Sequence, residues 1–178
     1  MSKKTAFGGD NHYQDFKAEG LRIARDSDLF VLKVWLKRLR SDEQTEVQQA
    51  AAVLHSVSDH SPQLFVPFVK ELVKVLHNSV HPAGPRFTYR LLAEISIPEK
   101  FQGEVVNASF KDLTNSRSPI AIKVFAMSLI ANHMRQYPEL AYELEAALRL
   151  GYRKGSAGYK SRARKIANTY GLRLDENM

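Results

Sequence analysis

The sequence has 178 residues, of which 44% are apolar and 25% charged, and its formal net charge is +7. A chain of this size and composition is typical of one globular domain that buries about 70% of its unfolded surface without disulfides or a structural metal. The absence of cysteine excludes zinc fingers, iron–sulfur sites, thiol catalysis and disulfides, and it favours a reducing, cytoplasmic compartment. No segment approaches the ~18 consecutive apolar residues of a membrane span, so we expect no membrane association.

Residues 1–25 are predicted to form a partly disordered N-terminal extension. Three glycines lie there among scattered polar residues, and chain ends fray where little holds them to a core. Phe16, Leu21 and Ile23 are the residues that we expect to dock onto the rest of the protein.

From residue 26 onward, apolar residues recur at three- and four-residue steps, which is the spacing of one face of an α-helix. The first such segment has leucines at positions 29, 32, 36 and 39 on its buried face, while Lys33, Lys37 and Arg40 fall on the other side. The pattern continues through eight predicted helices, at about residues 26–40, 42–57, 62–80, 87–95, 98–114, 119–134, 138–150 and 157–170.

Residues that begin and end helices support these ranges. Ser41 and Asp42 can cap the second helix, and Ser118 followed by Pro119 is the expected start of the sixth. Pro67 lies inside the third segment, where a proline disrupts an α-helix, so its regular part is expected to begin only near that residue. Gly171 is a natural end for the last helix. Strand patterns are absent from the sequence.

Three prolines, Pro62, Pro98 and Pro138, each follow one predicted helix and begin another, at separations of 36 and 40 residues. Helix pairs with a period of about 40 residues are typical of α-solenoids, in which each pair buries its apolar face against its neighbours. Over about residues 26–170 the chain resembles the HEAT and armadillo-like repeat proteins. This resemblance implies an all-α fold, an α-α superhelix of seven or eight helices within a single HEAT-like repeat domain over residues 26–178. An irregular helical bundle is the alternative.

The last three predicted helices are also similar to a small bacterial group of HEAT-like proteins without established activity. The resemblance implies no catalytic residues. It rests on these residues: Ser118, Pro119, Ala121, Ala126, Met127, Tyr137, Pro138, Glu139, Leu140 and the run from Gly155 to Arg162.

The positive charge is concentrated near the C-terminus. Eight basic residues and no acidic residue lie between Arg149 and Arg173, while the other 18 basic and 19 acidic residues nearly balance. Such a cluster favours acidic proteins or polyanions, although a solvated basic helix is the simpler interpretation. Gly155, Gly158 and the helix start that follows could bind an anion, or could only allow a tight turn and close packing. The candidate residues for binding an anion or a partner are Arg153, Lys154, Lys160, Arg162, Arg164 and Lys165.

Other chemistry finds little support in the sequence. His77 and His81 have the four-residue spacing of metal ligands on a helix, but the His-Glu-x-x-His pattern is absent and Pro82 follows directly. Phosphate loops, dinucleotide-binding glycines and nucleophile elbows are also absent. We therefore predict no catalytic residues, no metal and no cofactor.

Three classes of function follow. The first is a non-enzymatic scaffold that holds a protein or peptide on its solenoid surface. The second is a nucleic-acid-binding protein that uses the C-terminal basic helices, since the resemblance extends to the HEAT-like alkylpurine DNA glycosylases. Those enzymes use aromatic and carboxylate residues in a basic groove, and no motif assigns such a role to Trp35, the single tryptophan. The third is a small-molecule or metal enzyme. The oligomeric state is not predicted.

Overall fold

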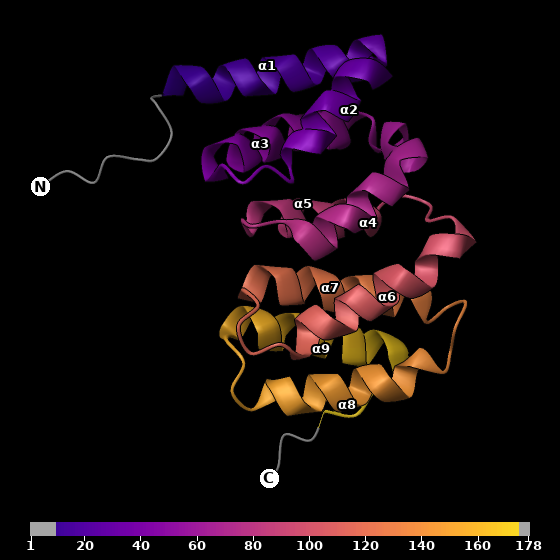
Figure 1. The fold of residues 1–178 in the computed structure, drawn as a ribbon. Coiled ribbons are helices and arrows are strands. Elements are labelled where there is room, and N and C mark those ends of the chain that lie inside the picture. The colour runs from indigo at the N-terminus through magenta and orange to yellow at the C-terminus, as the bar shows by residue number, and fades with distance from the viewer. Residues whose placement is uncertain (1–9, 175–178) are drawn as a thin grey trace, which may run out of the picture. The chain divides into compact units, whose positions relative to one another are not determined.

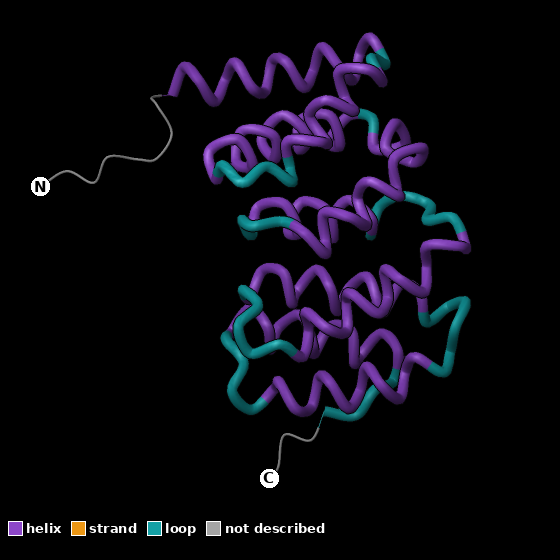
Figure 2. The backbone as a smooth tube through the Cα atoms, in the orientation of Figure 1, coloured by secondary structure: helices purple, strands orange, loops and turns teal. Residues whose placement is uncertain are grey.

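The computed structural model describes residues 10–174, and within this range the chain forms helices and loops without a strand (Figures 1 and 2). The prediction of an all-α fold is therefore confirmed. The helices are α1 (Asp10–Asp26), α2 (Leu29–Arg38), α3 (Gln44–His60), the 3-10 helix η1 (Pro62–Phe68), α4 (Val69–Asn78), α5 (Ala83–Leu92), α6 (Glu99–Thr114), α7 (Ile120–His133), α8 (Leu140–Tyr152) and α9 (Ala157–Tyr170). They belong to two compact units, unit 1 up to Ser96 and unit 2 from Ile97.

Helix α1 occupies residues that the sequence analysis assigned to a disordered extension, and for residues 10–25 that assignment is wrong. Packing against α3 stabilises this helix, and Ile23 is fully buried. Phe16 contacts Trp35 edge to face, with ring centroids 6.5 Å apart. Leu21 does not dock, since 39% of its surface is exposed. The predicted extension before residue 10 lies outside the described residues.

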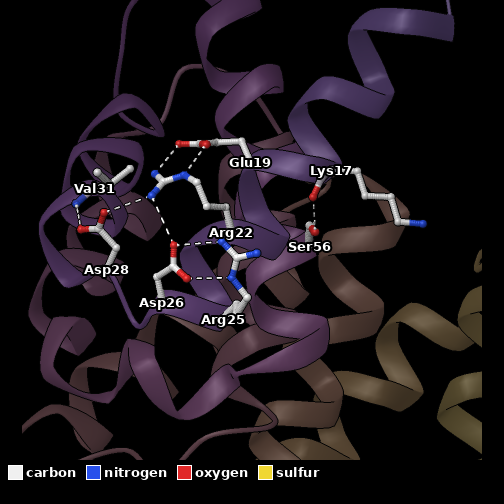
Figure 3. A network of polar contacts seen from close by, with 8 residues as sticks. All are labelled: Lys17, Glu19, Arg22, Arg25, Asp26, Asp28, Val31 and Ser56. Carbon is white, nitrogen blue, oxygen red and sulfur yellow. Dashed lines mark hydrogen bonds and ion pairs between the residues drawn. The ribbon is translucent and has the colours of Figure 1, made fainter.

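A polar network closes the sharp turn between α1 and α2 (Figure 3). Arg22 donates two hydrogen bonds of 3.0 Å to the Glu19 carboxylate and one of 3.4 Å to Asp28, and it lowers the pKa of Glu19. Asp28 also caps α2 by accepting a hydrogen bond from the backbone N–H of Val31 at 3.0 Å. Ser27 between the helices has φ of 52°, a left-handed conformation that a non-glycine residue adopts only when its surroundings hold it.

Unit 1 is built in two layers. Helices α1, α3 and α5 pack side by side in one layer, and α2 and α4 contact α3 and α5 from the other. The predicted helix over residues 62–80 is divided, because Pro67 cannot donate to an α-helical ladder and falls within the 3-10 helix η1. The α-helical part begins two residues later at Val69, close to the predicted position.

Unit 2 is organised around α7, which packs against α6, α8 and α9. This agrees with the sequence of residues 119–134, in which apolar residues occupy most of the helix circumference. Such a helix is typically buried on more than one side. The core of the unit joins side chains from all four helices, among them Phe110, Met127, Leu144 and Tyr159. Pro62 begins η1, Pro98 directly precedes α6, and Pro138 lies two residues before α8, so the proline period marks successive helix starts.

Three local expectations were wrong. Neither Ser41 nor Asp42 caps α3, whose N-cap is Glu43. Ser118 donates to the Asp112 carboxylate at 2.7 Å instead of capping α7. Leu29 keeps 42% of its surface exposed, because it is the first residue of α2 and precedes the buried residues Leu32 and Leu36. Gly171 ends α9 with φ of 69°, as expected.

Within residues 10–174, no helix combines the length and the apolar composition that crossing a bilayer requires.

Candidate functional site

The six predicted binding residues lie on the last helix and on the turn before it. Arg153 and Lys154 follow α8 directly, and both are exposed. On α9, Arg164 and Lys165 are exposed, while Lys160 and Arg162 are half-buried. None of the six forms an ion pair with a carboxylate of the described chain. Their charges are therefore available to a partner.

The structure does not bring the four cations of α9 to one face. Tyr159, Ala163, Ile166 and Ala167 are its buried residues. Because successive residues of an α-helix are rotated by about 100°, Lys160 and Arg164 lie on one flank of this buried stripe. Arg162 and Lys165 lie on the opposite flank. Lys160 also sits 5.7 Å from the centroid of the Tyr152 ring, a cation–π contact that fixes one of the four.

The segment from Gly155 into α9 owes its shape mainly to packing. A Cβ atom on Gly155 would lie 2.8 Å from the Tyr159 ring, and one on Gly151 would lie 2.3 Å from the Tyr159 hydroxyl. Gly158 has no such neighbour, since the nearest atom would be 3.9 Å away. Ser156 caps α9 by accepting a hydrogen bond from the backbone N–H of Tyr159 at 3.3 Å.

Two lysines border a small pocket beside this turn. Lys123 and Lys154 line a hollow of about 310 Å³ together with Tyr159. The Tyr159 hydroxyl is buried and has no hydrogen-bond partner among the described residues, and burial raises its pKa to about 12. Of the six predicted residues, only Lys154 borders this pocket.

The histidine pair suggested by spacing does not form a helical ligand pair. Helix α4 ends at Asn78, so His77 is helical and His81 belongs to the following turn. The Nδ1 atom of His81 accepts a hydrogen bond from the backbone N–H of Ala83 at 3.1 Å. The described side chains contain no group of three or more acidic or histidine residues that could hold a metal ion.

A groove between α2 and α4 was missed by the sequence analysis. It has a volume of about 360 Å³ and is lined by Phe30, Lys33, Val34, Leu36, Lys37, Arg40 and Glu71. Phe30 is 79% exposed and Val34 is 42% exposed, so the groove presents an apolar surface to solvent. We call this surface the α2 groove. Its signal in the sequence is that Phe30 and Val34 are apolar yet lie outside the leucine stripe.

The rim of the α2 groove is positively charged. Lys33, Lys37 and Arg40 form no ion pair with any carboxylate in the described part of the chain. The acidic residue of the lining, Glu71, is paired with Lys74 at 3.1 Å. An apolar surface with a cationic rim is complementary to a segment that carries apolar anchors among acidic residues.

A family model of the HEAT repeat domain matches residues 28–169 of the chain. The matched span runs from the N-cap of α2 into the last turn of α9 and leaves α1 outside it. The comparisons with curated proteins and with solved structures found no match.

Proposed function

The chain belongs to the HEAT repeat family, and from this premise we propose that it is a non-enzymatic binding module that holds an acidic peptide segment of a partner protein in the α2 groove. HEAT repeats generally mediate protein interactions, and stacked helix pairs present extended surfaces for this purpose. The observation that carries the proposal is the exposure of Phe30 beside three unpaired cations.

The energetics favour Phe30 as the main anchor contact. Aromatic residues in the centre of an interface contribute most of the binding free energy, and the charged rim mainly sets association rate and specificity. Phe30 and Val34 are one helical turn apart, so both can contact apolar side chains on one face of a bound helix. Lys33 and Lys37, which line the same groove, then face acidic residues of the bound segment.

The test is an anisotropy titration with a fluorescein-labelled peptide in which two leucines, four residues apart, are surrounded by glutamates. We expect saturable binding that weakens with salt, and no binding of the same peptide with lysines in place of the glutamates. Phe30→Ser should weaken binding about tenfold, the effect of losing about 1.4 kcal/mol.

The matched control is Tyr142→Ser in unit 2, because Tyr142 is 86% exposed and lies outside the α2 groove. This variant should bind the peptide as the unmodified protein does. The proposal fails if no acidic peptide binds saturably, or if Phe30→Ser and Tyr142→Ser bind equally well.

A second candidate is nucleic-acid binding through α9, which is favoured by four cations without described acidic partners. Because these cations divide between two flanks, a duplex would contact about two of them at once. The slope of log affinity against log salt should then be about −1.8, not the −3.6 of four contacts. Replacing Lys160, Arg162, Arg164 and Lys165 with alanine should abolish this binding, and a titration at low salt without saturable binding would exclude it.

A further inference from the structure

A second pocket in unit 1 collects polar side chains from elements far apart in the sequence. It has a volume of about 460 Å³ and lies where α3 and α5 pack together, with contributions from α1 and the turn before α5. The polar residues of its lining are Tyr13, Gln48, His55, Asp59, His81, Arg86 and Arg90. Its other lining residues are alanines, which leave space between the polar groups. We call it the α3/α5 pocket.

The carboxylate of this pocket is already satisfied. Arg90 forms an ion pair with Asp59 and a second one with Glu94 at 3.6 Å. The charge of Arg90 is therefore matched within the protein. Arg86 is exposed and forms no ion pair with a described carboxylate, so it is the cation that the pocket can offer to a ligand.

The contact between His55 and Arg90 fixes the proton on the imidazole. Arg90 Nη1 lies 2.8 Å from His55 Nδ1, and a guanidinium can only donate, so Nδ1 accepts and Nε2 carries the proton. Burial, followed by the charge of Arg90, lowers the pKa of His55 to about 4, which keeps this neutral tautomer at neutral pH. His55 Nε2 has no described acceptor and is not among the buried unpartnered atoms, so it can donate to a ligand.

The same reasoning orients Gln48. Since His81 Nδ1 accepts from the backbone N–H of Ala83, the proton of the neutral ring is on Nε2. Gln48 Nε2 is placed 3.0 Å from that nitrogen, which would set two donors against each other. A 180° rotation of the amide removes this conflict, because it brings the oxygen to His81 Nε2 and turns the NH₂ group away as a donor. Arg86, His55 and Gln48 therefore supply donors, and the Tyr13 hydroxyl can supply another.

We propose that the α3/α5 pocket binds the phosphate group of a small phosphate monoester through Arg86, His55 Nε2–H and the Gln48 amide. Three terminal oxygens, each with more than one acceptor position, match several separate donors better than the two oxygens of a carboxylate do. A pocket of about 460 Å³ is within the range of small-molecule sites, so it has room for an organic part beside the phosphate. The α2 groove shares no lining residue with this pocket, so the inference does not rest on the proposed function.

The test is a titration of the ¹⁵N-labelled protein with glycerol 1-phosphate, inorganic phosphate, acetate and glycerol, followed by NMR. We expect saturable shifts for glycerol 1-phosphate at residues 48, 55 and 86, weaker shifts for inorganic phosphate, and none for glycerol. If only the two phosphate probes bind, equally tightly, the site is one for free phosphate. If acetate binds as tightly as glycerol 1-phosphate, the phosphate assignment is wrong.

Two variants make the test specific. Arg86→Gln should weaken glycerol 1-phosphate binding at least about tenfold, since it removes a charge-assisted hydrogen bond to the phosphate. Arg135→Gln, at another exposed arginine that lies in unit 2, should bind as the unmodified protein does. Both sites are on the surface, so both variants should fold. Equal binding by the two variants, or shifts confined to the basic residues of α9, would overturn the proposal.

Discussion

Each unit contains a close contact between two helices that a glycine makes possible, but the atoms that lie against the glycine differ between the units. In unit 1, a Cβ on Gly20 would lie 2.5 Å from the backbone oxygen of Val53 and 2.5 Å from Ser56 Cβ. In unit 2, a Cβ on Gly151 would lie 2.3 Å from the hydroxyl of Tyr159, a side-chain atom. The backbone oxygen of Val53 is present whatever side chain residue 53 carries, whereas the Tyr159 hydroxyl can be removed by substitution. The two contacts should therefore differ in cost and in whether a second substitution restores them.

The surroundings of the two contacts also differ in polarity. Near Gly20 the Ser56 hydroxyl donates to the backbone oxygen of Lys17 at 2.9 Å, which joins α1 to α3 (Figure 3). Near Gly151 the buried Tyr159 hydroxyl has no described partner. In unit 1 the close contact of α1 with α3 is thus accompanied by a hydrogen bond between the two helices. The contact of Gly151 with Tyr159 in unit 2 depends on side-chain packing without a hydrogen bond from the hydroxyl.

Gly20→Ala should have the largest effect. We expect the free energy of unfolding to fall by about 3 kcal/mol, which is the upper part of the range for overfilled cores and exceeds the helix-propensity gain of about 1 kcal/mol. Urea unfolding followed by circular dichroism measures it. Adding Ser56→Ala should not restore stability, because the Val53 oxygen remains; recovery in the double variant would contradict this account.

Acid should destabilise the protein through His55 in unit 1. Because its pKa is lowered from 6.5 to about 4 by burial and by Arg90, the unfolded state binds more protons as the pH falls below 6.5. Stability is then greatest above pH 6.5 and falls by up to about 3 kcal/mol on reaching pH 4. Unfolding curves across this range should show a smaller decrease for His55→Gln, and identical pH profiles would refute the assignment.

Gly151→Ala should cost less, about 2 kcal/mol of overpacking against the Tyr159 ring. Tyr159→Phe removes the hydroxyl but keeps the ring carbon Cζ, which the new Cβ would meet at 2.7 Å, so the double variant should recover only part of the loss. Tyr159→Phe alone should be neutral or slightly stabilising, because the buried hydroxyl has no partner to lose. The same denaturation assay provides the double-mutant cycle, and strictly additive effects would argue against this contact.

Gly103→Ala provides the smallest effect and the matched control. Gly103 lies within α6, and a Cβ there would meet no atom within 4 Å. Alanine should therefore stabilise the protein by about 0.5–1 kcal/mol through helix propensity alone. A rise in the melting temperature would confirm this, and a loss of stability would show that glycine packing alone does not explain the other two sites.

Much of the fold could be predicted because local signals determine it. The helix starts near Pro62, Pro98 and Pro138 follow from what proline permits, and the apolar spacing predicted eight of the helices. Helix α1 was missed because Gly20 reads as a helix breaker in sequence. In the structure Gly20 instead lies at the crossing with α3, so tertiary packing stabilises the helix.

The sites were less predictable because they depend on contacts between distant residues. The basic residues of α9 could be named from the sequence, but their division between two flanks required the buried stripe to be known. His55 and Arg90 are 35 residues apart, and their contact depends on how one helix pair stacks on the next. The exposure of Phe30 has the same origin, since apolar spacing does not show which face a neighbouring helix leaves uncovered.

The position of Trp35 gives the protein an internal optical reporter. It is the single tryptophan of the sequence, it contacts Phe16 of α1, and the Arg38 guanidinium lies 4.6 Å from its ring centroid. Excitation at wavelengths that tyrosine does not absorb therefore reports on the α1–α2 contact in unit 1. The emission should respond when α1 separates from α2. Stopped-flow fluorescence could thus time the docking of the helix that the family match leaves out.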